Sequence, residues 1–381
     1  MSWAKAKIGN HCEITSSKRI FYSEYTDSGV PFYRSKEIIE LSQGQPISEP
    51  LYISAEKYNE IKSKFGVPMP GDMLLTSVGT IGVPYIVCQD DYFYFKDGNL
   101  TWFRNFDNSL LSRFLYYWIG SKDGYGVLNN STIGSSQKAL TISSLKQIEC
   151  PLPPIKVQEH IVDVLSAYDD LIENNQKQIK LLEEAAQRLY KEWFIDLRFP
   201  GHESTPVVDD IPVGWQKVAV TDLLEIKYGK DHKSLPDGNV PAYGSGGIMR
   251  KVASILRSGE SVLIPRKGSL NNIMYVSGDF WTIDTMFYSV PRVPNIVKYT
   301  YLYLLGLDMY SFNIGAAVPS MTVKILEGIS LLKPSENVLT LFEGNLSPLF
   351  ARKEALKKQI ETAGDIRDSL LSKLMTGEIV L

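Results

Sequence analysis

The sequence has few of the residues that form covalent or metal cross-links. It contains three cysteines and four histidines among 381 residues. Cys12, Cys88 and Cys150 are odd in number and widely spaced, which is typical of reduced thiols and predicts a cytoplasmic protein without a disulfide framework. Neither the cysteines nor the histidines have the spacing of metal ligands, so we expect no metal site.

The sequence also lacks long apolar runs. None approaches the roughly 18 residues that a membrane-spanning helix needs. The first residues, Met1-Ser2-Trp3-Ala4-Lys5, lack the apolar segment of a signal peptide. These two observations predict a protein with no membrane partner.

Motifs of common catalytic sites are missing as well. The sequence has neither a Gly-x-x-x-x-Gly-Lys-Ser/Thr phosphate loop nor a His-Glu-x-x-His metal motif. It also lacks the Asp/Asn-Pro-Pro-Tyr/Phe motif expected of an adenine methyltransferase. Gly244-Ser245-Gly246-Gly247 resembles a nucleotide loop only superficially, and we interpret it as a turn. We therefore predict no catalytic residues and no cofactor.

The overall charge is small, at −3, and the proportions of hydrophobic (44%) and charged (22%) residues indicate a globular protein. Basic and acidic residues balance in 1–150 and nearly balance in 200–335, whereas 155–199 and 336–381 are net acidic. This distribution argues against a protein that coats nucleic acid without regard to sequence. It leaves room for one basic face on each of the two balanced segments.

The second half of the chain repeats the first. Trp3-Ala4-Lys5 corresponds to Trp215-Gln216-Lys217, and Ile133-Gly134-Ser135-Ser136 corresponds to Ile314-Gly315-Ala316-Ala317. The second correspondence continues without a gap into two helical segments. Each half therefore consists of a mixed, turn-rich domain followed by one long helix, which is far longer than a solenoid repeat. A duplicated module predicts a target with two related halves.

Two segments show the heptad pattern of coiled-coil helices, and segments of about 40 residues predict rods ~60 Å long. Lys353 and Arg367 interrupt the second seam, and Asn175 is a polar seam residue that would fix the register. Matching lengths and registers favour pairing of the two helices with each other; the alternative is two separate helices, each packed on its own domain. The seams comprise Ile161, Leu165, Tyr168, Ile172, Asn175, Ile179, Leu182, Ala186, Leu189 and Trp193, and then Phe342, Leu346, Leu349, Lys353, Leu356, Ile360, Ala363, Arg367, Leu370 and Leu374.

These patterns predict an α+β fold. Two pseudo-twofold-related, mixed α/β domains would be separated by two long antiparallel coiled-coil helices. The helices should be antiparallel because a compact domain usually has neighbouring entry and exit points, so the second helix must return along the first. The predicted segments are the first domain at 1–154, the first helix at 155–199, the second domain at 200–335 and the second helix at 336–381.

Four motifs mark the ends of the long helices and the start of the second domain. Pro151-Leu152-Pro153-Pro154-Ile155-Lys156-Val157-Gln158-Glu159 leads into the first helix, and Leu189-Tyr190-Lys191-Glu192-Trp193-Phe194-Ile195-Asp196 ends it. Arg367-Asp368-Ser369-Leu370-Leu371-Ser372-Lys373-Leu374-Met375-Thr376-Gly377-Glu378-Ile379 ends the second helix, and Pro212-Val213-Gly214-Trp215 opens the second domain. In combination these motifs resemble the specificity (S) subunits of Type I restriction–modification enzymes. The chain departs from that pattern at Lys333-Pro334-Ser335-Glu336-Asn337, where the second proline-rich entry is degenerate.

The resemblance implies a DNA-specificity subunit that catalyses nothing itself. Each target-recognition domain would read one half of a bipartite, asymmetric sequence in double-stranded DNA, and the helices would act as a spacer of fixed length. The helices would also dock two modification (methyltransferase) subunits, which in turn support restriction (translocase/nuclease) subunits. Half-sites on one face of DNA lie about 34–36 Å apart, and a rod of ~60 Å can span that distance.

Base reading requires side chains that reach into a groove, so polar residues on glycine-flanked loops are the candidates for DNA contacts. Arg266 is the strongest, because an arginine can bind guanine or phosphate and Gly268 permits close backbone approach. Each loop can equally be an ordinary polar turn, and a solvated charge run is the favoured alternative for Lys230 and Lys233. The candidates are Arg34, Lys36, Ser77, Thr80, Gln137 and Lys138 in the first domain, and Lys230, Lys233, Tyr243, Ser245, Arg266, Lys267 and Ser269 in the second.

Aromatic residues gather near the end of the first long helix. Tyr190, Trp193 and Phe194 are candidates for docking a partner subunit, because aromatic side chains dominate many protein interfaces. The alternative is that they cap the helix against the second domain.

Two other functions stay open from the residues alone. One is a stand-alone DNA methyltransferase or nuclease, an enzyme that would methylate or cleave DNA without partner subunits. A coiled-coil scaffold could instead carry two ligand-binding domains unrelated to DNA.

Overall fold

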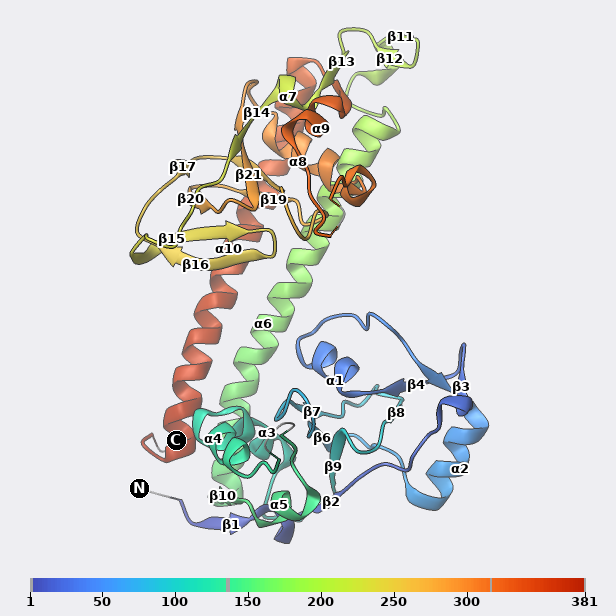
Figure 1. The fold of residues 1–381 in the computed structure, drawn as a ribbon, viewed down its shortest axis with the longest axis vertical. Coiled ribbons are helices and arrows are strands. Elements are labelled where there is room, and N and C mark those ends of the chain that lie inside the picture. Colours follow the sequence, from blue (N-terminus) through green and yellow to red (C-terminus); the bar gives the residue numbers. More distant parts are fainter. Residues whose placement is uncertain (1–2, 135–137, 316, 380–381) are drawn as a thin grey trace. The chain divides into compact units, whose positions relative to one another are not determined.

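The computed structural model describes residues 3–134, 138–315 and 317–379. The chain divides into two compact units, which we describe separately. Unit 1 comprises Met1–Gln176 and Lys357–Leu381, and unit 2 comprises Lys177–Leu356. Each unit combines short strands with helices (Figure 1), and the long helices α6 (Ile155–Tyr190) and α10 (Glu336–Thr376) contribute to both. The predicted α+β fold is confirmed.

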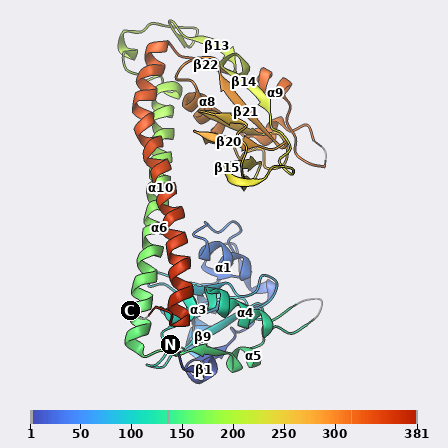
Figure 2. The same ribbon diagram turned by 90° about the vertical axis from the view of Figure 1, so that its left-hand side faces the viewer.

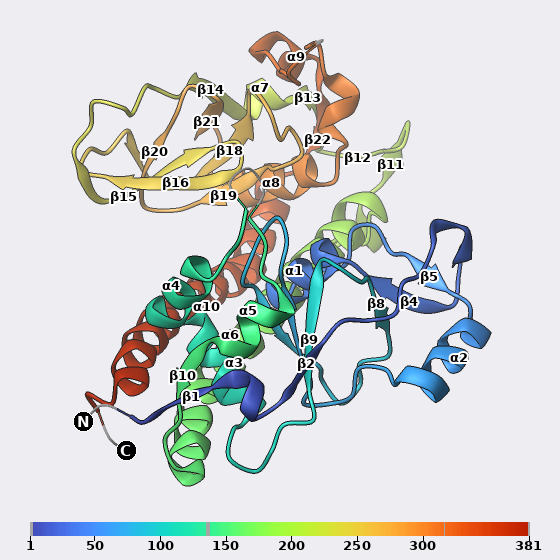
Figure 3. The same ribbon diagram turned by 60° about the horizontal axis from the view of Figure 1, so that its bottom comes forward.

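Unit 1 contains two four-stranded sheets and a two-stranded ribbon of β1 and β10. The first sheet has the strand order β2-β9-β6-β7, and the second has the order β3-β5-β4-β8 with β4 and β8 parallel. Figure 3 shows β9 beside β2 and β4 beside β8. The strands are β1 (Lys5–Lys7), β2 (Glu13–Thr15), β3 (Tyr25–Thr26), β4 (Val30–Tyr33), β5 (Tyr52–Ile53), β6 (Met73–Thr76), β7 (Pro84–Ile86), β8 (Tyr94–Phe95), β9 (Leu100–Arg104) and β10 (Glu149–Pro151). The helices are α1 (Ser35–Ser42), α2 (Ala55–Phe65), α3 (Ser112–Gly120), α4 (Lys122–Asn130) and α5 (Ile142–Gln147).

Unit 2 contains two four-stranded sheets and two ribbons, β11–β12 and β13–β22. The sheets have the orders β14-β21-β18-β19 and β16-β15-β20-β17, and Figure 1 shows the hairpin of β15 and β16. The strands are β11 (Val207–Val208), β12 (Ile211–Pro212), β13 (Gln216–Ala219), β14 (Leu224–Tyr228), β15 (Asp237–Gly244), β16 (Gly247–Val252), β17 (Arg257–Ser258), β18 (Ser261–Pro265), β19 (Met274–Val276), β20 (Asp279–Thr282), β21 (Met286–Pro291) and β22 (Ser330–Lys333). The helices are α7 (Val220–Leu223), α8 (Val297–Leu305) and α9 (Val323–Gly328).

The strand orders show that the two units share one architecture. The antiparallel sheet β2-β9-β6-β7 recurs as β14-β21-β18-β19, and the parallel pair β4–β8 recurs as β15–β20. In each unit an early strand also pairs with the strand that precedes a long helix: β1 pairs with β10, before α6, and β13 pairs with β22, before α10. The internal repeat of the sequence is therefore a repeat of the fold.

The long helices supply part of the hydrophobic core of each unit. Ile161 and Leu165 of α6 and Leu374 of α10 lie in the core of unit 1. Ala186 of α6 and Phe342 of α10 lie in the core of unit 2. Burial of a large apolar side chain stabilises a fold by about 1.5–3 kcal/mol, so these contacts anchor both helices firmly.

Both predicted heptad seams are buried or half-buried, and the charged residues that interrupt the second seam pair with α6. In unit 2, Lys353 Nζ lies 2.7 Å from Glu183 Oε1. In unit 1, Arg367 Nη1 lies 2.7 Å from Asp169 Oδ1, and Asn175 Nδ2 donates to Gln359 Oε1 at 3.3 Å. Within unit 1 the partner number on α10 falls as the number on α6 rises, so the helices pair with each other and run antiparallel (Figure 2). The alternative of two separately packed helices is excluded.

Candidate nucleic-acid interface

In unit 2, three of the loops predicted to contact DNA meet on one turn, residues 282–285. Lys230, after β14, donates its backbone N–H to the first carbonyl of the turn at 2.8 Å. The carbonyl of Tyr243, on β15, accepts from the second N–H of the turn at 3.0 Å. Arg266, after β18, donates its N–H to the last carbonyl at 2.8 Å. The fold therefore brings segments from three strands to one edge.

A fourth segment, 318–320, lies against the loop that contains Arg266 and Gly268. The N–H of Gly268 donates to Pro319 O at 2.9 Å, and the backbone of Arg266 accepts from Met321 N–H at 2.9 Å. Gly268 has φ +85°, a left-handed conformation, and a Cβ there would lie 3.0 Å from Ser245 Oγ. A side chain at this position would strain the backbone and crowd the neighbouring loop. We call segments 228–233, 243–247, 265–269 and 318–320 loop cluster 2.

Arg266 is held in place within loop cluster 2. Its Cζ lies 5.3 Å from the ring centroid of Tyr228, a cation–π contact, and its Nη1 donates to Asp284 O at 3.2 Å. Tyr228 itself is 54% exposed. Because a guanidinium carries five N–H donors, the remaining ones suit a base edge or a phosphate. Arg266 was predicted from the sequence and Tyr228 was not, although Tyr228 lies just before the lysine-rich loop, a position that could have identified it.

The other predicted residues of unit 2 fall into two groups. Lys230, Lys233, Lys267 and Ser269 are exposed, as a DNA contact requires. Tyr243 is half-buried against an apolar cluster, and burial raises the pKa of its hydroxyl. Ser245 is also half-buried, and its carbonyl accepts a 2.8 Å hydrogen bond from Asn272 Nδ2. These last two residues contribute mainly to the construction of the loops.

Unit 1 builds an equivalent group of loops around Asn99. Ser77 N–H and Ser35 Oγ both donate to Asn99 O, at 2.8 and 3.3 Å. Leu140 N–H donates to Ser77 O at 2.9 Å, as Met321 does to Arg266 in unit 2. Gly79 also has a left-handed φ of +79°, like its counterpart in unit 2. We call segments 16–18, 33–36, 76–80 and 138–140, as far as the structure describes them, loop cluster 1.

Several predicted contact residues of loop cluster 1 have internal partners. The Ser77 side chain is 2% exposed, and its hydroxyl lies 2.6 Å from Thr101 Oγ1. Arg34 Nη2 lies 2.6 Å from Glu37 Oε1, a carboxylate that is fully buried, and this hydrogen bond raises the pKa of Arg34. We therefore interpret Ser77 and Arg34 as residues that shape the loops.

The other residues of unit 1 that were predicted to contact DNA are not held by buried partners. Thr80 and Lys138 are exposed. Lys36 Nζ lies 3.0 Å from Glu49 Oε1 in an exposed ion pair, which a phosphate can displace at little cost. Gln137 lies outside the described residues.

Unit 1 also has a basic pocket that sequence analysis missed. Lys18 Nζ lies 4.4 Å from the ring centroid of Phe65, and Arg104 Cζ lies 4.4 Å from that of Trp102. The cavity measures about 280 Å³ and is lined mainly by polar groups, including Lys64. Lys18 occupies the position in unit 1 that Lys230 occupies in unit 2, so the internal repeat could have revealed it. The pocket is lined by Thr15, Ser16, Lys18, Lys64, Phe65, Gly66, Tyr94, Trp102 and Arg104.

The aromatic residues at the end of α6 do not form an exposed patch. Tyr190, Trp193 and Phe194 are 9%, 7% and 6% exposed and belong to the core of unit 2. The ring of Phe194 packs against Tyr299 and Phe342 with centroid distances of 4.7 and 4.6 Å. The expected docking surface at these residues is therefore corrected: their burial supports the alternative, in which they cap the helix against the second domain.

Comparison with known proteins finds relatives that are Type I restriction–modification specificity subunits. The family described as "Type I restriction modification DNA specificity domain" matches residues 1–184. The MjaIX Type I restriction enzyme specificity subunit of Methanocaldococcus jannaschii is 27% identical over 428 aligned residues, which cover 99% of this chain and 93% of that protein. This chain belongs to the specificity-subunit family of Type I restriction–modification systems. It is a DNA specificity subunit and thus a non-catalytic component.

Two further relatives extend the comparison. A putative Type I specificity subunit of Haemophilus influenzae, S.HindORF215P, is 28% identical over 186 residues, or 49% of this chain and 45% of that protein. The crystal structure of the Type I S subunit from M. genitalium has the same fold, with a TM-score of 0.62 and 19% identity over 98% of this chain and 96% of that one. Two long helices and two mixed β units are thus the architecture of this specificity subunit.

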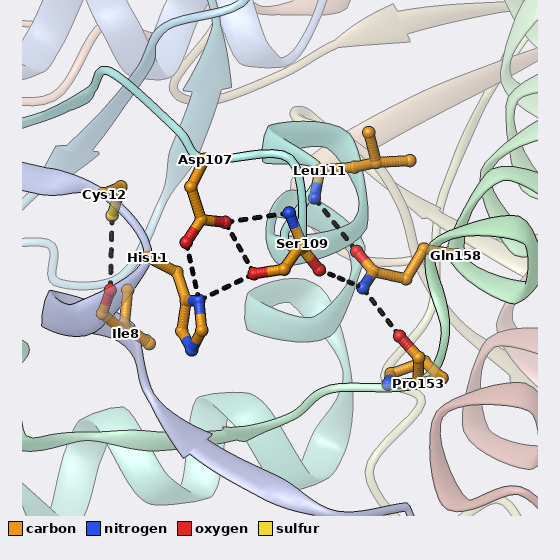
Figure 4. Close-up of polar contacts among 8 residues, drawn as sticks. All are labelled: Ile8, His11, Cys12, Asp107, Ser109, Leu111, Pro153 and Gln158. Carbon is orange, nitrogen blue, oxygen red and sulfur yellow. Dashed lines mark hydrogen bonds and ion pairs between the residues drawn. The ribbon is translucent and has the colours of Figure 1, made fainter.

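The proline-rich motif of the specificity subunit gains a physical explanation from Gln158, which is fully buried at the start of α6 (Figure 4). Its Oε1 accepts from Leu111 N–H at 2.9 Å. Its Nε2 donates to Ser109 O at 2.7 Å and to Pro153 O at 2.8 Å. One side chain therefore fastens the first turn of the long helix to the loop before α3.

A Ser-His-Asp group lies close by, but it lacks the geometry of a catalytic triad. His11 Nδ1 lies 3.0 Å from Asp107 Oδ2 and 2.8 Å from Ser109 Oγ (Figure 4). In a triad the carboxylate and the hydroxyl contact opposite ring nitrogens, so that one orients the base and the other loses its proton. Here both contact the same nitrogen, so the group is a loop fastening. Among the described residues, no cluster of three or more His, Cys, Asp or Glu could hold a metal ion.

The cysteines and helices add two further observations. Cys12 and Cys150 are buried free thiols, and burial raises the pKa of each to about 12, so both are poorly reactive. Cys88 is exposed. In the part of the chain that the structure describes, none of the helices is both long and apolar enough to cross a membrane.

Proposed function

We propose that each unit reads one half of a bipartite, asymmetric sequence in double-stranded DNA through its loop cluster. The observation that carries this proposal is that one scaffold of loops is built twice with different side chains. Ser77-Val78-Gly79-Thr80 follows β6, whereas Arg266-Lys267-Gly268-Ser269 follows β18 at the equivalent place. Equivalent scaffolds with unequal contact residues suit two different half-sites.

The chemistry of the loops supports separate roles for base and backbone contacts. Arg266, held by Tyr228, would read a base edge, for which guanine is the commonest partner of arginine. Lys230 in loop cluster 2 and Lys18 in loop cluster 1 carry the point charges that suit phosphates. Phosphate contacts position the protein, and base contacts give it specificity.

The long helices would set the distance between the two readers. Helix α6 has 36 residues and α10 has 41, which correspond to about 54 and 62 Å. Both are continuous and both enter the core of each unit. The helices would also dock two modification (methyltransferase) subunits, and restriction (translocase/nuclease) subunits would join through these.

Sequencing of methylated sites tests the reading of half-sites. The chain would be co-expressed with its modification subunit in a host without methylation, as wild type, as Arg266→Ala and as the control Arg292→Ala, an exposed arginine outside the loop cluster. We expect Arg266→Ala to relax or abolish one half of the methylated motif while the other half is retained. Loss of specificity in both halves, or a motif without two parts, would contradict the proposal.

Insertion of one heptad tests the spacer role. Seven residues added after Gln176 and seven added after Leu356 keep both seams in register and lengthen each helix by about 10 Å. Since DNA rises 3.4 Å per base pair, the gap between half-sites should grow by about three base pairs. An insertion in one helix alone breaks the register and serves as the control. An unchanged gap with both insertions would overturn this part of the proposal.

A further inference from the structure

In unit 2 of the specificity subunit, two consecutive apolar side chains are exposed on β16, the edge strand of its sheet. Ile248 is 58% exposed and Met249 is 57% exposed. Single exposed apolar residues are common on protein surfaces, but an exposed pair beside a proposed binding site suggests a contact surface. Strands β15 and β16 form the hairpin whose turn, 243–247, belongs to loop cluster 2. The pair therefore lies next to the loops that are proposed to read DNA.

A β-bulge explains why both side chains are exposed. Residues of a regular strand alternate between the two faces of the sheet. In this hairpin Ala242 pairs with Arg250 but Tyr243 pairs with Ile248, so Met249 is an extra residue on β16. Such a bulge bends the strand and re-aims its side chains, and bulges are frequent beside functional sites.

The side chain of Met249 lies against loop cluster 2. A Cβ on Gly244 would lie 2.6 Å from Met249 Sδ and 3.2 Å from Ile283 Cδ1. The absence of a side chain at Gly244 therefore leaves the space that Met249 occupies. Ile283 belongs to the turn 282–285, whose carbonyls also accept hydrogen bonds from the backbone and side chain of Arg266. Met249 and Arg266 thus lie at the same turn.

Unit 1 has a helix where unit 2 has this hairpin. The parallel pairs β4–β8 and β15–β20 correspond, but β4 leads into α1 and β15 leads into β16. The apolar residues of α1, Ile38, Ile39 and Leu41, are buried or half-buried. The exposed apolar pair therefore distinguishes the two units at this position of the repeat, and its ligand should belong to one half-site.

We infer that Met249 contacts the C5-methyl group of a thymine in the half-site read by unit 2. The major groove of DNA admits a two-stranded β-ribbon, and the thymine methyl is the apolar group that the bases present there. A methionine suits this contact because its side chain is flexible and its sulfur is polarizable. The contact selects an A·T pair beside the base that Arg266 reads. This inference rests on the proposed function, in which loop cluster 2 reads DNA.

The experiment compares duplexes that carry thymine or uracil, two bases that differ only by the C5-methyl group. Sequencing of methylated sites first gives the motif, and the half that Arg266→Ala relaxes is the half-site of unit 2. The affinity of the complex with the modification subunit is then measured for duplexes in which each thymine of that half-site is replaced in turn by uracil. Wild type should lose about fourfold in affinity at one position. Met249→Ala should bind the thymine duplex about fourfold more weakly than wild type and should bind both duplexes equally.

Two further variants serve as controls. Val208→Ala removes a side chain of similar exposure, 59%, from β11, outside loop cluster 2, and should distinguish thymine from uracil as wild type does. Met249→Leu keeps an apolar side chain of similar volume and should retain part of the discrimination. Circular dichroism and thermal unfolding of each free variant check that the fold is retained.

The outcomes separate this inference from the proposed function. A unit 2 half-site without an A·T pair, or equal binding of thymine and uracil duplexes by wild type, would overturn the methyl contact. Weaker binding by Met249→Ala with unchanged discrimination would show another role, such as a wedge between base pairs, and would also overturn it. A wild-type complex without a two-part motif would instead contradict the proposed function itself.

Discussion

Arg367 Nη1 donates to Asp169 Oδ1 at 2.7 Å and joins the two long helices at a position where the heptad pattern requires an apolar residue. Asp169 Oδ2 also accepts from the hydroxyl of Tyr117, on α3, at 2.6 Å. The carboxylate therefore connects both long helices to the recognition domain of unit 1. A charged interruption of the seam acts here as a specific three-part contact.

Removal of Arg367 should destabilise unit 1. Arg367→Ala leaves a half-buried carboxylate with one partner, and we expect a loss of about 1–2 kcal/mol in the free energy of unfolding. Urea denaturation followed by circular dichroism measures it. A double-mutant cycle with Tyr117→Phe should give a coupling of at least about 0.5 kcal/mol. The control Arg188→Ala, at a guanidinium 82% exposed, should change stability by less than about 0.5 kcal/mol; equal effects at the two arginines would refute a specific role.

Lys298 should control the pH dependence of unit 2. It is 4% exposed, and its Nζ lies 2.5 Å from Glu260 Oε1 and from Glu343 Oε1. Burial alone would raise the pKa of Glu260, but hydrogen bonds from Lys298 and Tyr275 outweigh it and lower the pKa. A carboxylate with a lowered pKa contributes stability above its unfolded pKa, and this contribution is lost as pH falls below about 4.

Lys298→Met should reverse that dependence. Without the cation, only the Tyr275 hydrogen bond opposes the effect of burial on Glu260. The pKa of Glu260 therefore rises, and stability at pH 7 should fall by about 2 kcal/mol, less than for a fully buried pair because Glu260 is 36% exposed. Protonation of Glu260 removes the cost of its buried charge. The difference in unfolding free energy between the variant and the wild type should therefore narrow as pH falls from 7 to 5. Thermal unfolding across this range measures it, with the exposed Lys324→Met as the control. A gap independent of pH would contradict the ion-pair explanation.

Gln158 should be essential for the start of α6. Gln158→Leu preserves volume but leaves the N–H of Leu111 and two carbonyls without their partner, at an expected cost of about 2–3 kcal/mol in unfolding free energy. Gln147→Leu, at an exposed position, is the control. In unit 2 the equivalent residue is the buried Leu339, so Leu339→Gln should destabilise as well. Tolerance of Gln158→Leu would show that the hydrogen bonds do not hold the helix.

Lys18 and Lys230 should contribute to DNA affinity independently of sequence. In the complex with the modification subunit, Lys18→Ala and Lys230→Ala should each reduce the slope of log affinity against log salt by about 0.9. Binding to specific and to non-specific duplexes should weaken by the same factor, because a phosphate contact carries no sequence information. Lys217→Ala, an exposed lysine on β13, should leave the slope unchanged. A change in sequence preference at Lys18 or Lys230 would assign these residues to base contacts instead.

Sequence periodicity predicted the repeat, the α+β class and the pairing of two antiparallel helices, because apolar spacing and chain connectivity limit how such segments can bury their surfaces. The loop containing Arg266 was also predictable, since an arginine next to a glycine is a local feature. The sequence could not reveal that Tyr228 contacts Arg266, because 37 residues of chain separate them and only the folded sheet brings them together.

Burial and pairing were decided only by the tertiary structure. Ser77 and Arg34 were plausible DNA contacts in the sequence, yet one is enclosed and the other is bound to Glu37. The same holds for Trp193, whose aromatic ring suits both an interface and a core. Side-chain type specifies which contacts are chemically possible, whereas packing between segments far apart in the chain determines which of them form.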